Sequence, residues 1–353
     1  MGGRKPPLFN KYKSGFLLAL NYLKFKMKEV VFMKNYIIRR IIQMIPVFIG
    51  ILFILFFILE QAPGTPVSNM MHPKMTPEQK AELALKLGLD VPWYERFVNW
   101  ISEALHGNLG YSINHKKPVV DVMGDYVGPT LLLSLVSLCI SIIIGIPAGV
   151  VSATKQYSYV DNALTVISFI GISIPSFFFG LILLKLFAVD VQIFPLFGLQ
   201  NPLLKTDSSF IKAMDIAKHL FLPSIVLGLG STASFMRYTR SSMLEVIKQD
   251  YIRTARAKGL KEKTVIYRHA FRNAVIPIIT LLGFWIPSLL SGAVVTETIF
   301  ALPGLGKISV EATLTRNYPL ILGINSMLAI LTLIGALVAD ILYAIADPRI
   351  RYD

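Results

Sequence analysis

Two glycine-rich segments match, by residue type and spacing, motifs that bind nucleotides. Residues 228–233 (Gly-Leu-Gly-Ser-Thr-Ala) fit the dinucleotide-binding fingerprint, but they lie inside a long apolar run with no strand before them and no ribose-binding acid after them. Residues 304–307 (Gly-Leu-Gly-Lys) resemble the end of a P-loop, but Ile308 stands where a Ser or Thr would hold magnesium. The sequence therefore predicts that this chain binds no nucleotide, and that another subunit would bind any ATP.

Ionisable residues inside apolar runs are the next candidates for chemistry, because a charge at the centre of a bilayer costs roughly 2.5–3.5 kcal/mol. Lys185 and Asp340 lie in such runs, each nearer an end than the middle, where the side chain can reach an interface. A structural role is favoured for both. No chain of Asp, Glu and His indicates a proton relay, which weakens the hypotheses of a proton-coupled carrier and of an intramembrane protease. The single cysteine, Cys139, indicates neither a disulfide nor a metal cluster.

The most polar feature is the segment Asp250–Pro277, which lies between two long apolar runs. Gly259 predicts a helix break or a turn near its middle. Ala255 lies four residues earlier, so a helix would place both small residues on one face that another protein could approach closely. The plainer alternative is a solvated loop on the cytoplasmic side of a membrane. Two acids oppose seven basic residues, which are Arg253, Arg256, Lys258, Lys261, Lys263, Arg268 and Arg272.

The composition places these features in a membrane protein. The chain has 353 residues, of which 54% are hydrophobic and 16% are charged, and its mean hydropathy is +0.59. Soluble domains carry about 25% charged residues. The net charge of +14 could indicate nucleic acid, but Lys and Arg gather on the cytoplasmic loops of membrane proteins, which explains the excess without a polyanion. We therefore expect a polytopic membrane protein with the lipid bilayer, and no nucleic acid, as its partner.

Six apolar runs of about 20 residues fit membrane-spanning helices, so we predict an all-α fold with six transmembrane helices. Prolines within the runs, such as Pro147, Pro175 and Pro223, predict bent helix axes. Six crossings from a cytoplasmic N-terminus return the C-terminus to the cytoplasm. The predicted spans are Ile41–Leu59, Thr130–Ser152, Ala163–Val189, His219–Tyr238, Ala274–Val295 and Pro319–Ala344.

The polar segments between the runs divide the chain further. The N-terminal extension is basic and is predicted at the membrane surface, and the sequence from Met33 resembles a start in its own right, which favours a dispensable extension. The segment after the first span has balanced charges, which places it outside, and Thr76 predicts a helix start there. In order, the predicted segments are the extension 1–32, the first transmembrane helix 33–60, the extracellular segment 61–129, the transmembrane core 130–344 with its cytoplasmic loop 240–273, and the cytoplasmic tail 345–353.

Several longer motifs are spread along the chain from Met33 onward. They are Tyr36-Ile-Ile-Arg-Arg40, Ala62-Pro-Gly64, Arg240-Ser-Ser-Met-Leu-Glu245-Val, Asp250-Tyr-Ile-Arg-Thr-Ala-Arg-Ala-Lys-Gly259-Leu, His269-Ala-Phe-Arg-Asn273-Ala, Ile299-Phe-Ala-Leu-Pro303-Gly-Leu-Gly306, Asp340-Ile-Leu-Tyr343 and Asp347-Pro-Arg-Ile350. In these motifs the chain resembles the membrane subunits of binding-protein-dependent ABC importers, specifically the oligopeptide/dipeptide permease branch. Residues 1–32 lie outside the resemblance.

The resemblance implies the fold of a type I ABC importer permease, with a coupling helix that docks in a cleft of an ATPase subunit. Arg253, Thr254 and Ala255 stand where the family's EAA loop has Glu-Ala-Ala, as is usual in the peptide branch. The later Ile-x-Leu-Pro pattern is not matched at its usual spacing, and Pro277 falls later. The ATPase-coupling residues implied in this way are Tyr251, Arg253, Thr254, Ala255, Arg256, Ala257, Lys258, Gly259 and Leu260.

The resemblance also implies partners and a mechanism. The partners would be a second, homologous permease subunit, two cytoplasmic ATPases that carry the ATP and magnesium, and an extracellular or periplasmic substrate-binding protein, all at a bacterial cell membrane. The implied mechanism is alternating access, in which ATPase motion reorients the spans. Two alternatives stay open: a nickel or metal–chelator importer of the same family, and a stand-alone channel or ion-coupled carrier.

Overall fold

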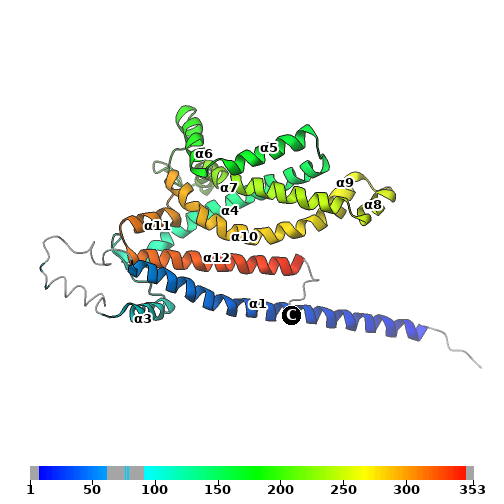
Figure 1. Cartoon of the computed structure of the whole chain (residues 1–353), viewed down its shortest axis with the longest axis horizontal. Helices are drawn as coiled ribbons and strands as arrows, with labels where there is room; N and C mark the ends of the chain where they lie inside the picture. Colours follow the sequence, from blue (N-terminus) through cyan, green and yellow to red (C-terminus); the bar gives the residue numbers. More distant parts are fainter. Residues whose placement is uncertain (1–7, 62–75, 77, 79–90, 347–353) are drawn as a thin grey trace, which may run out of the picture.

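A computed structural model describes residues 8–61, 76, 78 and 91–346 of the chain. The described residues are mostly helical (Figure 1). The predicted all-α fold needs one small correction, because strands β1 (Tyr111–Ser112) and β2 (Lys117–Pro118) form an antiparallel pair. Thr76 itself is described, but most of the helix predicted to start there, and nearly all of the tail 345–353, lie outside the described residues.

The first helix, α1 (Leu8–Gln61), is 54 residues long and includes both residues 8–32 of the basic extension and the first predicted span. The extension is therefore continuous with the span rather than a separate element. Only Asn35–Gln61 is apolar enough to cross a membrane. Near the C-terminal end of α1, Phe53 makes ring contacts with Trp93 and Phe97 of α3 (Trp93–Leu105). Arg96 of α3 forms an ion pair with Glu60.

Four long helices build the core, and two of them begin or end well outside the predicted spans. Helix α4 begins within the segment predicted to be extracellular, and α7 continues into the predicted cytoplasmic loop. The four are α4 (Val119–Thr154), α7 (Ser209–Ile247), α10 (Phe271–Ile299) and α12 (Tyr318–Ala346), with the short α11 (Leu305–Leu314) between the last two. Within the described residues, four helices are long and apolar enough to cross a membrane, and they lie in α1, α4, α7 and α12 but not in α10. A bent pair of helices would raise the number to five.

The bent pair corrects the predicted single span Ala163–Val189. Helix α5 (Tyr159–Ser173) ends at an extended Ile174, and α6 (Ser176–Leu183) starts after Pro175 at an angle of 103°. The cause is local, because the ring of a proline disfavours the helical conformation of the residue before it and removes a hydrogen-bond donor. Helix α6 continues as the π-helical segment η1 (Leu184–Asp190). Proline in the run was a correct indication of a bend, but the bend breaks the helix in two.

Helices α4 and α7 lie side by side because small residues let their backbones approach closely. A Cβ atom added to Gly149 would lie 2.5 Å from the carbonyl oxygen of Met236 and 2.5 Å from Cβ of Thr239. A Cβ atom added to Gly145 would lie 2.7 Å from the carbonyl oxygen of Thr232. These are contacts with α7 backbone and with atoms close to it, so rotation of a side chain cannot relieve them.

We predict that Gly149→Ala lowers the free energy of unfolding by about 1–3 kcal/mol, because the added methyl group must push α7 away. The matched control is Gly124→Ala on the same helix, where an added Cβ meets nothing within 4 Å. That change should stay within about 1 kcal/mol of wild type, since alanine favours helix over glycine. Thermal unfolding of the two purified variants in detergent measures the difference. Equal midpoints would contradict the close packing of α4 on α7.

Candidate functional site

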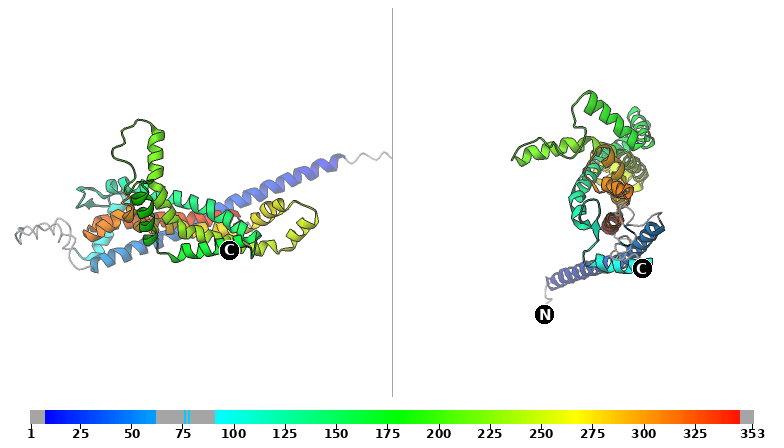
Figure 2. Two further views of the ribbon diagram at one scale, coloured as in Figure 1. Left: turned by 90° about the horizontal axis from the view of Figure 1, so that it is seen from above. Right: turned by 90° about the vertical axis from the view of Figure 1, so that its left-hand side faces the viewer.

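The basic segment after α7 folds into three short helical pieces rather than an irregular loop. Helix α8 (Asp250–Ala257) is followed by α9 (Glu262–Thr264) and by the π-helical segment η2 (Val265–Ala270), which leads directly into α10. Figures 1 and 2 show α8 and α9 together beyond the end of α7, at the opposite end of the molecule from α11. All the predicted coupling residues therefore gather at one end of the helices.

Local chemistry determines where α8 starts and stops. Asp250 in its first turn and Arg256 in its last turn both complement the helix dipole. After Lys258 the backbone turns at Gly259, whose φ of +73° is left-handed, and the Gly259 amide donates a hydrogen bond to the Arg256 carbonyl at 2.9 Å. The predicted break at Gly259 is confirmed.

Helix α8 has one buried face and one exposed face. Ile252 (0% exposed) and Ala255 (6% exposed) pack into a cluster with Met243 of α7 and Val265 of η2. The prediction that Ala255 and Gly259 share one accessible face is therefore wrong, because Ala255 faces the core of its own chain and Gly259 lies beyond the end of the helix. The other predicted coupling residues are exposed: Tyr251, Arg253, Thr254, Arg256, Ala257, Lys258, Gly259 and Leu260.

Two polar contacts hold α8 against the segments that follow it. The Arg256 guanidinium donates hydrogen bonds to Glu262 of α9 at 2.7 and 3.2 Å, and this contact lowers the pKa of the Glu262 carboxyl below its usual value. The side-chain amide of Asn273, in α10, donates a hydrogen bond to the Tyr251 hydroxyl at 3.1 Å. Both contacts are exposed, so they orient the loop but add little to its stability.

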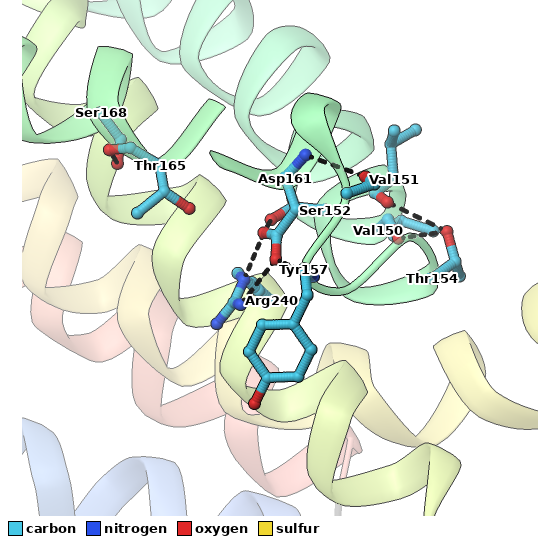
Figure 3. A network of polar contacts seen from close by, with 10 residues as sticks. Val150, Val151, Ser152, Thr154, Tyr157, Asp161, Thr165, Ser168 and Arg240 are labelled. Carbon is cyan, nitrogen blue, oxygen red and sulfur yellow. Dashed lines mark hydrogen bonds and ion pairs between the residues drawn. The ribbon is translucent and has the colours of Figure 1, made fainter. Parts of the chain in front are cut away.

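An ion pair between a buried aspartate and a half-buried arginine fixes the end of α7 from which the loop departs (Figure 3). Asp161, at the start of α5, is 1% exposed and accepts hydrogen bonds from Arg240 of α7 at 2.8 and 2.9 Å. Its carboxylate also accepts hydrogen bonds from the Ser152 hydroxyl of α4 and from the Tyr157 amide, the latter at 2.9 Å. One carboxylate thus joins α4, α5 and α7.

Sequence reasoning missed Asp161 as part of the site. A local signal existed, because Ser158 lies three residues before Asp161 and caps α5 by accepting a hydrogen bond from the Asp161 amide at 3.3 Å. That signal marks a helix start, but it does not reveal the partner of the acid, since Arg240 is far away in the sequence.

The other candidates from the sequence have internal partners. Lys185 forms an ion pair with Asp190 at 2.7 Å, and Asp340 forms one with Arg40 of α1 at 3.3 Å. Gly304 is the N-cap of α11 and residues 305–307 are its first turn, where the Lys307 amide donates a hydrogen bond to the carboxylate of the buried Glu297 at 3.0 Å. Residues 228–233 lie within α7, so neither glycine segment has the strand and loop of a nucleotide site.

Together these contacts can transmit force. The cluster under α8 includes side chains of α4, α7, η2 and α10, so a displacement of α8 is resisted by three of the long helices. Close-packed side chains transmit strain because the protein interior has low compressibility. The arrangement is therefore suited to mechanical coupling, with an exposed basic face on one side and the long helices on the other. Among the described residues there is no cluster of side chains that could hold a metal ion.

We predict that Asp161→Asn destabilises the protein by about 3 kcal/mol, because it leaves Arg240 without its buried counter-charge. The matched control is Asp190→Asn, which removes the same charge from the exposed pair with Lys185 and should cost at most about 1 kcal/mol. Thermal unfolding in detergent measures both. A cost for Asp161→Asn no larger than for Asp190→Asn would show that the network does not hold the three helices together.

Comparison with the sequences of known proteins shows the family of this chain. The family described as "Binding-protein-dependent transport system inner membrane component" matches residues 145–352, and its N-terminal companion matches residues 33–134. The oligopeptide transport system permease protein AppB of Bacillus subtilis is 44% identical over 321 residues, which cover 91% of this chain and all of that protein. The dipeptide transport system permease protein DppB of Escherichia coli K12 is 37% identical over 340 residues, covering 91% and 99%.

Among solved structures, an inward-facing MetNI methionine ABC transporter covers 65% of this chain and 97% of its own, with 19% identity and a TM-score of 0.49, a similarity too low to support an argument. The two family matches and the relatives' identity confirm the resemblance seen in the sequence. This chain belongs to the family of binding-protein-dependent transport system inner membrane components.

Proposed function

We propose that this chain is a membrane-spanning subunit of an ATP-driven importer that moves oligopeptides or dipeptides delivered by an extracellular binding protein. The observation that carries the proposal is the two-faced helix α8, whose buried face reaches the long helices while its basic face is open. The relatives' names support the choice of peptides. No observation on the described residues favours the nickel or metal–chelator alternative, or a stand-alone channel.

The proposed topology has six crossings with both termini in the cytoplasm. Four long apolar helices and the bent pair supply five of them. We assign the sixth to α10, whose 29 residues rise about 44 Å and so exceed the hydrocarbon core of a bilayer. The basic loop between α7 and α10 then faces the cytoplasm, in agreement with the positive-inside rule, and the segment 61–118 lies outside.

The proposed docking surface is the exposed face of α8 together with the turn that follows it. It comprises Tyr251, Arg253, Thr254, Arg256, Ala257, Lys258, Gly259 and Leu260. An ATPase subunit docks there, and two ATPases serve this chain and a second, homologous permease. ATP and magnesium are bound by the ATPases. A partner shifts the equilibrium between inward-facing and outward-facing forms only through its different affinity for the two, so the contact with α8 must differ between them.

Arg253→Glu tests the docking surface. The Arg253 side chain is 78% exposed, so we expect a reversed charge there to leave the fold intact. We expect the variant to recover at least about tenfold less ATPase in affinity co-purification from mild detergent, while it keeps the partner permease. The control is Lys212→Glu, an equal charge reversal at an exposed position near the start of α7, which should recover both partners. If wild type recovers no ATPase in several detergents, the importer assignment fails; if Arg253→Glu behaves like wild type, the surface is elsewhere.

Gly259→Ala tests the turn after α8. Its left-handed backbone makes alanine unfavourable by about 1–2 kcal/mol, which should disturb the turn and weaken coupling between ATP hydrolysis and peptide import. Gly198→Ala is matched in strain, since Gly198 has a φ of +82° but lies far from α8. Reconstituted complexes should show fewer peptides imported per ATP for Gly259→Ala only. Equal losses in the two variants would mean that strain alone, and not the position of the turn, matters.

A further inference from the structure

A partly open cavity of about 460 Å³ lies at the break between α5 and α6. Its walls come from both sides of the break, from α7 and from α10, where Trp285 and Thr296 face it. None of the described residues that line it is charged. Glu297 follows Thr296 but does not line the cavity. Its carboxylate accepts hydrogen bonds from the Thr130 hydroxyl and from the Lys307 amide at the start of α11. The volume falls in the range of about 300–1,000 Å³ that small-molecule sites occupy.

One wall of the cavity is the start of α6. Pro175 and Ser176 line the cavity, and no side chain caps this helix end. The first hydrogen bond of the helix is donated by the Phe179 amide to the Pro175 carbonyl at 3.0 Å, so the amides of Ser176, Phe177 and Phe178 have no acceptor among the described residues. Such amides and the positive end of the helix dipole favour an anion, and broken helices of transporters place this end toward a substrate carboxylate.

The α7 wall of the cavity carries a second, independent indication of a ligand. Ser231 and Ser234 of α7 are 4% and 8% exposed, and both line the cavity. Neither hydroxyl has a hydrogen-bond partner among the described residues, whereas Thr232 between them donates to the Gly228 carbonyl at 2.8 Å. Three other hydroxyls, those of Ser134, Ser224 and Thr239, also lack a partner among the described residues, but they do not line the cavity. The hydroxyls of Ser231 and Ser234 are the ones available to donate to a polar group bound in the cavity, as buried polar groups usually do.

We propose that this cavity binds the C-terminal carboxylate of a peptide in transit, with the α6 amides and the hydroxyls of Ser231 and Ser234 as donors. The inference rests on the proposed function. Every unmodified peptide ends in a carboxylate whatever its side chains, so donors for this group recognise the whole substrate class. The apolar side chains of Val226 and Leu229, which also line the cavity, suit the carbon atoms near the terminus. Because no fixed charge is present, the carboxylate is bound without being trapped.

A cysteine-protection experiment tests the proposal on the complex of this chain with its partner permease and ATPases, without the binding protein. The variant is Ser234→Cys in a Cys139→Ser background, and labelling of this chain by a methanethiosulfonate is followed by mass. The probes are Ala-Ala-Ala with a free carboxylate and the same tripeptide as its C-terminal amide. We expect the free acid to slow labelling about tenfold more than the amide does. Equal protection by both probes, or none by either, would overturn the proposal.

A matched pair of variants at Gly230 provides a second test. Gly230 lines the cavity, and a Cβ added there meets nothing within 4 Å. Gly230→Asp places a competing carboxylate in the cavity and should remove the preference for the free acid and reduce import of Ala-Ala-Ala about tenfold, while the uncharged Gly230→Asn keeps both. Equal behaviour of the two variants would overturn the carboxylate site. Import by wild type without any acid preference would sink this site alone, whereas absence of peptide import would sink the proposed function as well.

Discussion

Asp161 and Arg240 meet at the point where α4 ends, α5 begins and α7 leaves the bundle toward α8. A carboxylate that is 1% exposed and accepts four hydrogen bonds holds one geometry, because each donor would lose a buried partner if the carboxylate moved. The cluster around Met243 and Ile252 lies on the next turns of the same helix and its loop. The position of α8 relative to the long helices therefore depends on this ion pair. A surface at α8 can move the long helices only if it is rigidly connected to them.

The polar groups of the long helices differ in whether they have a partner inside the chain. Some hydroxyls in the core donate to the backbone of their own helix, as Ser137 does to the Leu133 carbonyl at 2.7 Å and Thr232 does to the Gly228 carbonyl. Others, those of Ser134, Ser224 and Thr239, are buried and have no partner among the described residues. The two charged residues within the predicted spans are paired within the chain, Asp340 with Arg40 and Lys185 with Asp190. The break at Pro175 adds to the unpartnered polar groups, because it leaves amides without acceptors at the cavity that Ser231 and Ser234 also line. Backbone without internal partners is tolerated at membrane depth only where it is enclosed by protein or lines a cavity.

The predicted coupling residues are only partly determined by the local sequence. Charge, helical compatibility and Gly259 were sufficient to locate the loop and the break in it, because backbone preferences of glycine act locally. The same pattern assigned Ala255 to the accessible face, which is wrong. In a helix of eight residues, one small side chain can point either way, and the choice depends on Met243 and Val265, which lie on other elements.

The amino-acid sequence by itself determined the class of the protein. Hydrophobic composition, the positions of the long apolar runs and the family motifs are properties of the chain that need no folded partner, and they led correctly to a helical membrane subunit of a binding-protein-dependent transport system. Only the tertiary structure decided that the third run breaks by 103°, that α1 and α7 extend far beyond their apolar parts, and that Asp161 pairs with Arg240. Hydropathy records how apolar a segment is, but it cannot record the angle at which a helix resumes after a proline or which distant charge a buried acid will meet.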